Sequence, residues 1–175
     1  FKTGTATEAV GVLYSYHKDA GRPGAWAPGT PGLAGRTTDG TTTTDGGCIP
    51  FTNPSTGAIY LISANAFSTV TGTLELWDVL WVNSGIVVTT TTGQTINSVT
   101  WPARDVNGST NGEGVNVAIV ATAATTNVGA VTNTTLTYTN SDGTASRTAT
   151  MPSTIPGGGW PATAVIGTVQ PFYLA

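Results

Sequence analysis

The loop from Asp105 to Glu113 has the residue types that bind calcium. Oxygen-bearing side chains stand at every second position, 105, 107, 109, 111 and 113, and calcium prefers such oxygens. Glycine, however, fills the fourth and eighth places of the loop rather than the sixth, and the twelfth place is Asn116 rather than Glu. Because Asn, Gly and Ser are also the ordinary turn formers, the pattern favours a structured connection between strands. Calcium binding is the alternative.

A hydroxyl, an imidazole and a carboxylate lie close together in the sequence at Ser15, His17 and Asp19. These are the groups of a hydrolase triad, but a triad is assembled in space from separate elements. No nucleophile turn between a strand and a helix is visible, no pair of carboxylates has a spacing that indicates glycoside chemistry, and no phosphate-binding glycine motif occurs. The sequence therefore predicts a protein that is not an enzyme, with no catalytic residues, no metal and no cofactor.

The aromatic residues are the remaining candidates for a site. We expect Trp77, Trp81 and Trp101 to pack in the core, because they lie in or beside apolar stretches. Trp26 and Trp160 lie in Pro/Gly-rich loops, where a tryptophan anchors a protein interface or stacks on a sugar ring. We favour the interface. Cys48 stands alone, so no disulfide forms within the chain, and the pattern is typical of a small buried hydrophobe.

Composition indicates what kind of elements hold these residues. Threonine supplies 36 of the 175 residues, and its branched side chain favours strands over helices. Only 9% of the residues are charged, against about 25% in an ordinary domain. Such a surface loses little hydration when a neighbouring protein covers it. The composition predicts an all-β protein that packs against other proteins.

The same totals argue against several classes of partner. The net charge is −3, and the six Lys and Arg residues are scattered, so we expect no binding to nucleic acid or to an anionic membrane surface. No run of 18 apolar residues occurs, so no membrane-spanning helix is expected. The chain starts at Phe1 and stops within an apolar run, and we expect it to be part of a longer protein.

Residues 1–57 differ from the rest of the chain. They hold one short apolar stretch at 9–16, then a Pro/Gly-rich segment, 19–57, with too few apolar residues for a core of its own. A long structureless loop is uncommon inside a compact domain. We therefore expect an extended arm on a neighbouring subunit, with a flexible linker as the alternative. The candidate interface residues of the arm are Trp26, Leu33, Ile49 and Phe51, with Cys48 beside them; Trp160 is the candidate outside it.

From residue 58 to 175 the chain indicates short strands between turns. The clearest feature is a hairpin in which Asp142 and Gly143 form the turn. Eight or nine strands at this spacing predict an antiparallel β-sandwich of jelly-roll type, with a closed barrel as the weaker option. The stretch 73–82 also fits a helical stripe, but we interpret it as a buried strand. The expected strands are 58–64, 73–82, 86–91, 95–101, 114–122, 135–139, 144–151 and 163–170.

Three segments carry a resemblance to a known group of proteins: LWDVLWVNSGI at 76–86, PARDVNGSTNGEGV at 102–115 and LTYTNSDGT at 136–144. Over residues 58–175 the chain resembles β-rich virion structural proteins of tailed bacteriophages. The resemblance implies a bacteriophage capsid decoration or cement protein, located in the virion after assembly in the host bacterial cytoplasm. It implies the major capsid protein or other virion proteins as partners, and a homo-oligomer, with a trimer favoured. A tail-fibre or surface carbohydrate-binding module is the alternative.

Overall fold

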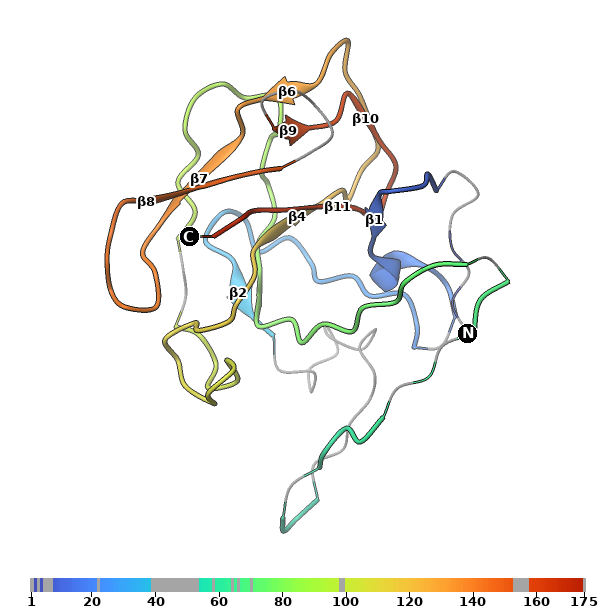
Figure 1. The fold of residues 1–175 in the computed structure, drawn as a ribbon, viewed down its shortest axis with the longest axis vertical. Coiled ribbons are helices and arrows are strands. Elements are labelled where there is room, and N and C mark those ends of the chain that lie inside the picture. The colour runs from blue at the N-terminus through green and yellow to red at the C-terminus, as the bar shows by residue number, and fades with distance from the viewer. Residues whose placement is uncertain are drawn as a thin grey trace.

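The computed structural model describes most of the chain, with gaps. The described residues are 2, 4, 8–21, 23–38, 54–57, 59–63, 65, 67–69, 71–97, 100–152 and 158–174. Within them the fold is all-β, as predicted: the only helical element is a single 3₁₀ turn, and every paired strand is antiparallel. Figure 1 shows the short strands gathered in one body, from which a stretch of chain extends.

The strands are short, two to four residues each. In chain order they are β1 (Leu13–Tyr14), β2 (Arg36–Thr37), β3 (Trp81–Val82), β4 (Ala118–Val120), β5 (Thr125–Thr126), β6 (Val131–Thr132), β7 (Thr135–Tyr138), β8 (Arg147–Thr150), β9 (Gly159–Trp160), β10 (Thr163–Ala164) and β11 (Thr168–Pro171), with the 3₁₀ turn η1 (Tyr16–Lys18) after β1. Among the described strands, β1, β11 and β4 form a three-stranded sheet in that order. The others pair as β10 with β5, β2 with β3, β6 with β9 and β7 with β8. These sheets are small and separate, and none is closed.

The hairpin of β7 and β8 confirms the turn prediction. Thr135 pairs with Thr150 and Tyr138 with Arg147. At the turn, the Asn140 side-chain oxygen accepts a hydrogen bond from the Thr144 N–H at 2.8 Å. Gly143 has a φ of 79°, the left-handed conformation that glycine adopts without steric cost. The turn residues alone therefore determine where the chain reverses.

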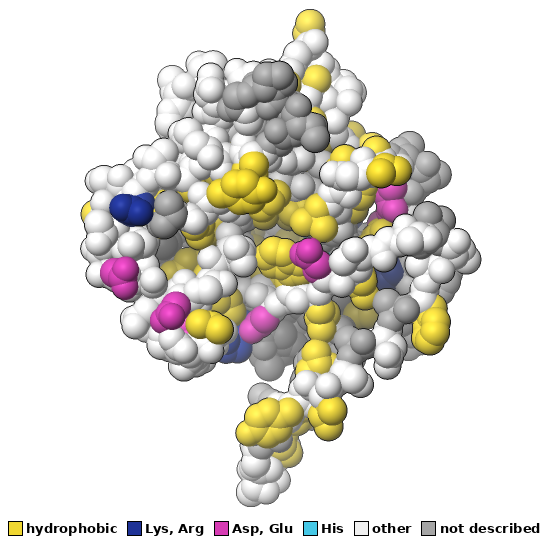
Figure 2. Space-filling model, viewed as in Figure 1, with side chains coloured by type: hydrophobic (Ala, Val, Ile, Leu, Met, Phe, Trp, Pro, Cys, Tyr) yellow, Lys and Arg dark blue, Asp and Glu magenta, His cyan; other side chains and the backbone are white. Residues whose placement is uncertain are grey.

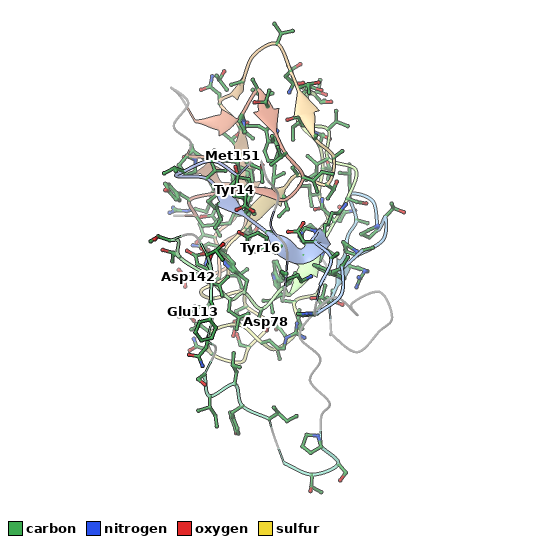
Figure 3. All side chains as sticks on the ribbon, turned by 90° about the vertical axis from the view of Figure 1, so that its right-hand side faces the viewer. Tyr14, Tyr16, Asp78, Glu113, Asp142 and Met151 are labelled. Carbon is green, nitrogen blue, oxygen red and sulfur yellow. The ribbon has the colours of Figure 1, made fainter. Side chains whose placement is uncertain are left out.

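A cluster of apolar side chains forms the core beside these sheets. Its two largest fully buried members are Met151, 0% exposed, and Trp160, 1% exposed. The other buried members are Ala121, Ala149, Ala164 and Phe172. Figure 3 places Met151 within the body, among the strands. The core therefore draws on β8, β9 and β10, together with the residues that follow β4 and β11.

The burial of Trp160 corrects the prediction that it lies in an exposed loop as an interface anchor. The preceding glycines explain why it is inside. Gly159 has a φ of 143°, and a Cβ atom there would collide with the Val131 carbonyl oxygen. Glycine thus lets β9 approach β6 closely enough to pair Val131 with Trp160. The glycine run that indicates a loop in the sequence instead allows a tight strand contact.

The described part of the predicted arm also packs on its own chain. Its strand β2 pairs with β3. Trp26 is only 7% exposed, with its ring edge-on to His17 at a centroid distance of 5.6 Å. The expectation that Trp26 is buried against a neighbouring subunit is wrong. Leu33 is half-buried, and Cys48, Ile49 and Phe51 lie outside the described residues.

The stretch 59–97 departs furthest from the predicted strands. Of its described residues only β3, Trp81–Val82, is in a strand, so the expected strands at 58–64, 86–91 and 95–101 do not form there. Trp77 was expected in the core and is 47% exposed. Leu80 is buried, so the predicted buried strand at 73–82 is reduced to its last residues. High β propensity is not sufficient here because a strand also needs a partner.

We predict that Trp160→Ala lowers the free energy of unfolding by about 3–5 kcal/mol, since it empties a large volume in a closed core. Trp77→Ala is the matched control, because Trp77 is half exposed and its loss leaves no internal cavity. Urea unfolding at low protein concentration measures both variants. Equal effects of the two substitutions would contradict the assignment of Trp160 to the core.

Candidate assembly surface

The loop 105–113 is built around the carboxylate of Asp105. Its Oδ1 accepts the Asn107 N–H at 3.1 Å and also the Ser109 N–H. Its Oδ2 accepts the Ser109 hydroxyl at 2.6 Å and the N–H groups of Gly112 and Glu113, each at 3.2 Å. Asp105 is buried. One side chain therefore accepts four of the backbone N–H groups of the loop, those of residues 107, 109, 112 and 113.

This arrangement favours the structured connection over calcium binding. Both oxygens of Asp105 already accept protein hydrogen bonds, and Glu113 Oε2 accepts one from the Asn107 amide at 2.6 Å. Within the described residues no group of three or more His, Cys, Asp and Glu side chains is placed to hold a metal ion. The hydroxyl of Ser109 is the main cause that lowers the pKa of Asp105 from 3.8 to about 2, because it stabilises the ionised form.

The structure brings Ser15 and His17 together at η1. The Ser15 hydroxyl lies 2.7 Å from His17 Nδ1, while the imidazole packs against Trp26. Burial is the main cause that lowers the pKa of His17 from 6.5 to about 4, and the charges of Lys18 and Lys2 add to it. The neutral imidazole is thus favoured in the folded state, and its ring serves as a packing surface for Trp26.

A hollow lies beside this turn. Its volume is about 320 Å³, and four separate stretches of chain line it: Lys18, then Ala27, Pro28, Gly29 and Thr30, then Asn83 and Ser84, and finally Thr122. Asn83 Nδ2 is buried without a hydrogen-bond partner. The Lys18 ammonium group donates to the Thr122 carbonyl at 3.2 Å. Sequence reasoning missed the hollow because its lining residues are distant along the chain.

A larger feature is a run of exposed apolar side chains between residues 59 and 77, here named the apolar segment. Tyr60 is 80% exposed, Ile62 94% and Phe67 98%. Its other exposed apolar members are Ile59, Leu61, Leu74, Leu76 and Trp77. In Figure 1 the teal chain around 54–63 extends beyond the body. Figure 2 shows hydrophobic side chains on that extension, and Figure 3 shows side chains on it pointing into solvent.

Much of the described backbone of the apolar segment lies outside the strand pairing of the fold. Within the described residues, none of 59–63 or 71–79 lies in a strand, and none makes a backbone–backbone hydrogen bond. Glu75 is the single charged residue between 59 and 77, and the same stretch contains no Lys, Arg or Pro. Soluble proteins commonly protect exposed β-prone chain with such residues. The apolar segment therefore has the properties of an interaction surface.

The C-terminal end of the apolar segment is attached to the body through residues 78–80, here called its root. Arg104 forms an ion pair with Asp78, with Nε and Oδ2 3.0 Å apart. The Arg104 guanidinium also donates to the Thr38 carbonyl at 2.9 Å, and the Thr38 N–H donates to the Leu80 carbonyl at 3.1 Å. The chain is thus anchored from residue 78 onward.

The structure does not unite the predicted interface residues in one surface. Trp26 and Trp160 are buried in their own chain, and Leu33 is half-buried. Ile49 and Phe51 lie outside the described residues. The sequence did contain the signal for the apolar segment, since it is apolar and almost uncharged. The apolar residues there predicted strands at 58–64 and 73–82, because the sequence does not show whether a partner strand covers them.

Comparisons with protein-family models, with curated proteins and with solved structures found no match for this chain. In the described residues no helix is long and apolar enough to cross a membrane.

We predict that Asp105→Asn lowers the urea midpoint of unfolding at neutral pH, because a neutral amide is a weaker acceptor for the clustered N–H groups. The folded pKa of Asp105 is below its ordinary value, so its contribution is present above about pH 3.8 and is lost as the pH falls toward about 2. The gap between wild type and variant should close over that range. Asp142→Asn, at an exposed turn position, is the control, and an equal effect of the control would contradict this role of Asp105.

His17 should make stability depend on pH in a different range. Its folded pKa is about 4 against 6.5, so the unfolded state binds the proton first and stability falls as the pH drops from 6.5 to 4. The slope is at most about 1.4 kcal/mol per pH unit, and smaller because the ring is partly solvated. Urea unfolding of wild type and His17→Gln should show the difference. His17 is the single histidine, so NMR can follow its titration directly. A midpoint near pH 6.5 in the folded protein would refute the lowered pKa of His17.

Proposed function

We propose that this chain is a non-enzymatic structural protein of a bacteriophage particle, most simply a capsid decoration or cement protein. The observation that carries the proposal is the apolar segment, which combines exposed apolar side chains with two described stretches, 59–63 and 71–77, that make no backbone–backbone hydrogen bond within the described residues. Such a surface is stable in solution only when another protein covers it. A particle made of many protein copies provides such a cover.

The composition of the surface supports the same proposal. Only 15 of the 175 residues are charged, and Figure 2 shows few charged side chains on the face in view. Burying hydroxyl and apolar groups costs less than burying ions. A capsid-bound protein buries much of its surface permanently, so a low charge favours that environment. The partners we propose are the major capsid protein or other virion proteins.

The resemblance to virion proteins adds the finer features of the proposal. We propose an antiparallel sandwich of jelly-roll type as the arrangement that the short sheets approximate. We also propose a homo-oligomer in the virion, with a trimer as the number of copies expected at a capsid position of three-fold local symmetry. The trimer rests on analogy with the family rather than on any contact within this chain.

A carbohydrate-binding module of a tail fibre is the second candidate. The hollow beside Lys18 favours it, because its lining includes Lys18, whose ammonium group can donate to sugar hydroxyls. The buried positions of Trp26 and Trp160 weigh against it, since neither ring is exposed for stacking on a sugar. The structural role is therefore the better supported of the two.

Immunogold electron microscopy on purified particles of the virus that encodes the chain tests the proposal. An antibody raised against the purified chain should label intact particles at regular positions. A glycan array probed with the same chain should give no binding. Absence of the chain from purified particles, together with binding to a defined glycan, would reverse the ranking of the two functions.

A further inference from the structure

The apolar segment presents enough surface for a stable protein contact. Its eight exposed apolar side chains together offer on the order of 1,000 Å², since a fully exposed aromatic residue contributes about 150–250 Å². A standard interface buries about 800 Å² on each partner. The segment alone therefore meets the area that a specific association needs, without any contribution from the body.

The lack of charge bears on which partner fits. An interface with a different protein commonly uses complementary charges for selection and steering, and the apolar segment offers only Glu75 for that purpose. A contact between two identical segments has the opposite requirement, because it must avoid bringing like charges together. When copies of one chain meet about a symmetry axis, like residues approach each other, so an almost uncharged segment brings together few like charges.

The backbone supports the same partner. Chain that makes no backbone–backbone hydrogen bond within the described residues, as at 59–62, can add to another strand through main-chain hydrogen bonds. The segment 59–62, Ile-Tyr-Leu-Ile, is β-prone and apolar, so a second copy of it supplies both matching hydrogen bonds and an apolar face. The attachment of Asp78 to Arg104 holds the root in place, which reduces the entropy lost when the segment is ordered by its partner.

We infer that the apolar segment, residues 59–77, associates with a second copy of this chain and is the main contact of its homo-oligomer. The inference deepens the proposed structural function and rests on it for its biological setting. The association itself can be tested on the purified chain, without the particle. The inference assigns the main assembly contact to 59–77, whereas the sequence predicted it in the arm 19–57, of which residues 39–53 lie outside the described residues.

The double substitution Tyr60→Lys and Ile62→Lys tests the inference. Both side chains are almost fully exposed, so the variant should fold, and two charges should oppose burial in a contact. Val128→Lys is the matched control, because Val128 is a fully exposed apolar residue outside the segment. Circular dichroism should confirm that wild type and both variants have the same fold.

Sedimentation velocity at protein concentrations up to roughly 100 µM then gives the result. Wild type and Val128→Lys should form the same homo-oligomer, while the double variant should dissociate at least tenfold more readily. A monomeric wild type, or a double variant that associates like wild type, would overturn the inference. A wild type that stays monomeric but labels particles would leave the structural function in place and assign the segment to another virion protein. An oligomer that is absent from particles would instead refute the proposed function alone.

Discussion

The pairing of β11 with two strands is the interaction on which the rest of the fold depends. β11 lies between β1 and β4, so it joins the start of the described chain to its end. The other described sheets have two strands each, and a two-stranded sheet is marginally stable in water. They gain stability through the shared core, where Phe172, just after β11, contacts the cluster of Met151 and Trp160. The central strand and the core thus support each other.

Local chemistry explains which parts of this fold could be predicted from the sequence. The β7–β8 hairpin is specified by its turn residues, Asn140 to Gly143, so both its existence and its place were predictable. The extent of the strand at 73–82 was not predictable. The sequence does not show that β3 pairs with β2, more than 40 residues earlier, or that the described residues 73–80 lie outside any strand. Trp160 was misplaced because Gly159 indicates a loop locally, although it permits a close strand contact that only the fold reveals.

The low charge of the chain predicts contacts with other proteins, and we expected these contacts in the Pro/Gly-rich residues 19–57. The described part of that stretch has partners in its own chain: Trp26 contacts His17, and Arg36 pairs with Val82. Eight of the exposed apolar side chains of the described residues lie between 59 and 77. Composition gives the amount of apolar surface, whereas only the pairing of distant strands decides which part stays exposed.

The exposed segment and the low charge are two aspects of one physical constraint. A chain that keeps a β-prone apolar stretch uncovered risks unspecific aggregation, and many proteins reduce that risk with Lys or Pro at the exposed strand. Residues 59–77 contain neither, and either residue would weaken the association proposed for this segment, which depends on burial. The Arg104–Asp78 ion pair offers a different safeguard, since it fixes the root and so limits the orientations that the segment can adopt. A fixed root favours one geometry of association over many, which is what an ordered assembly requires.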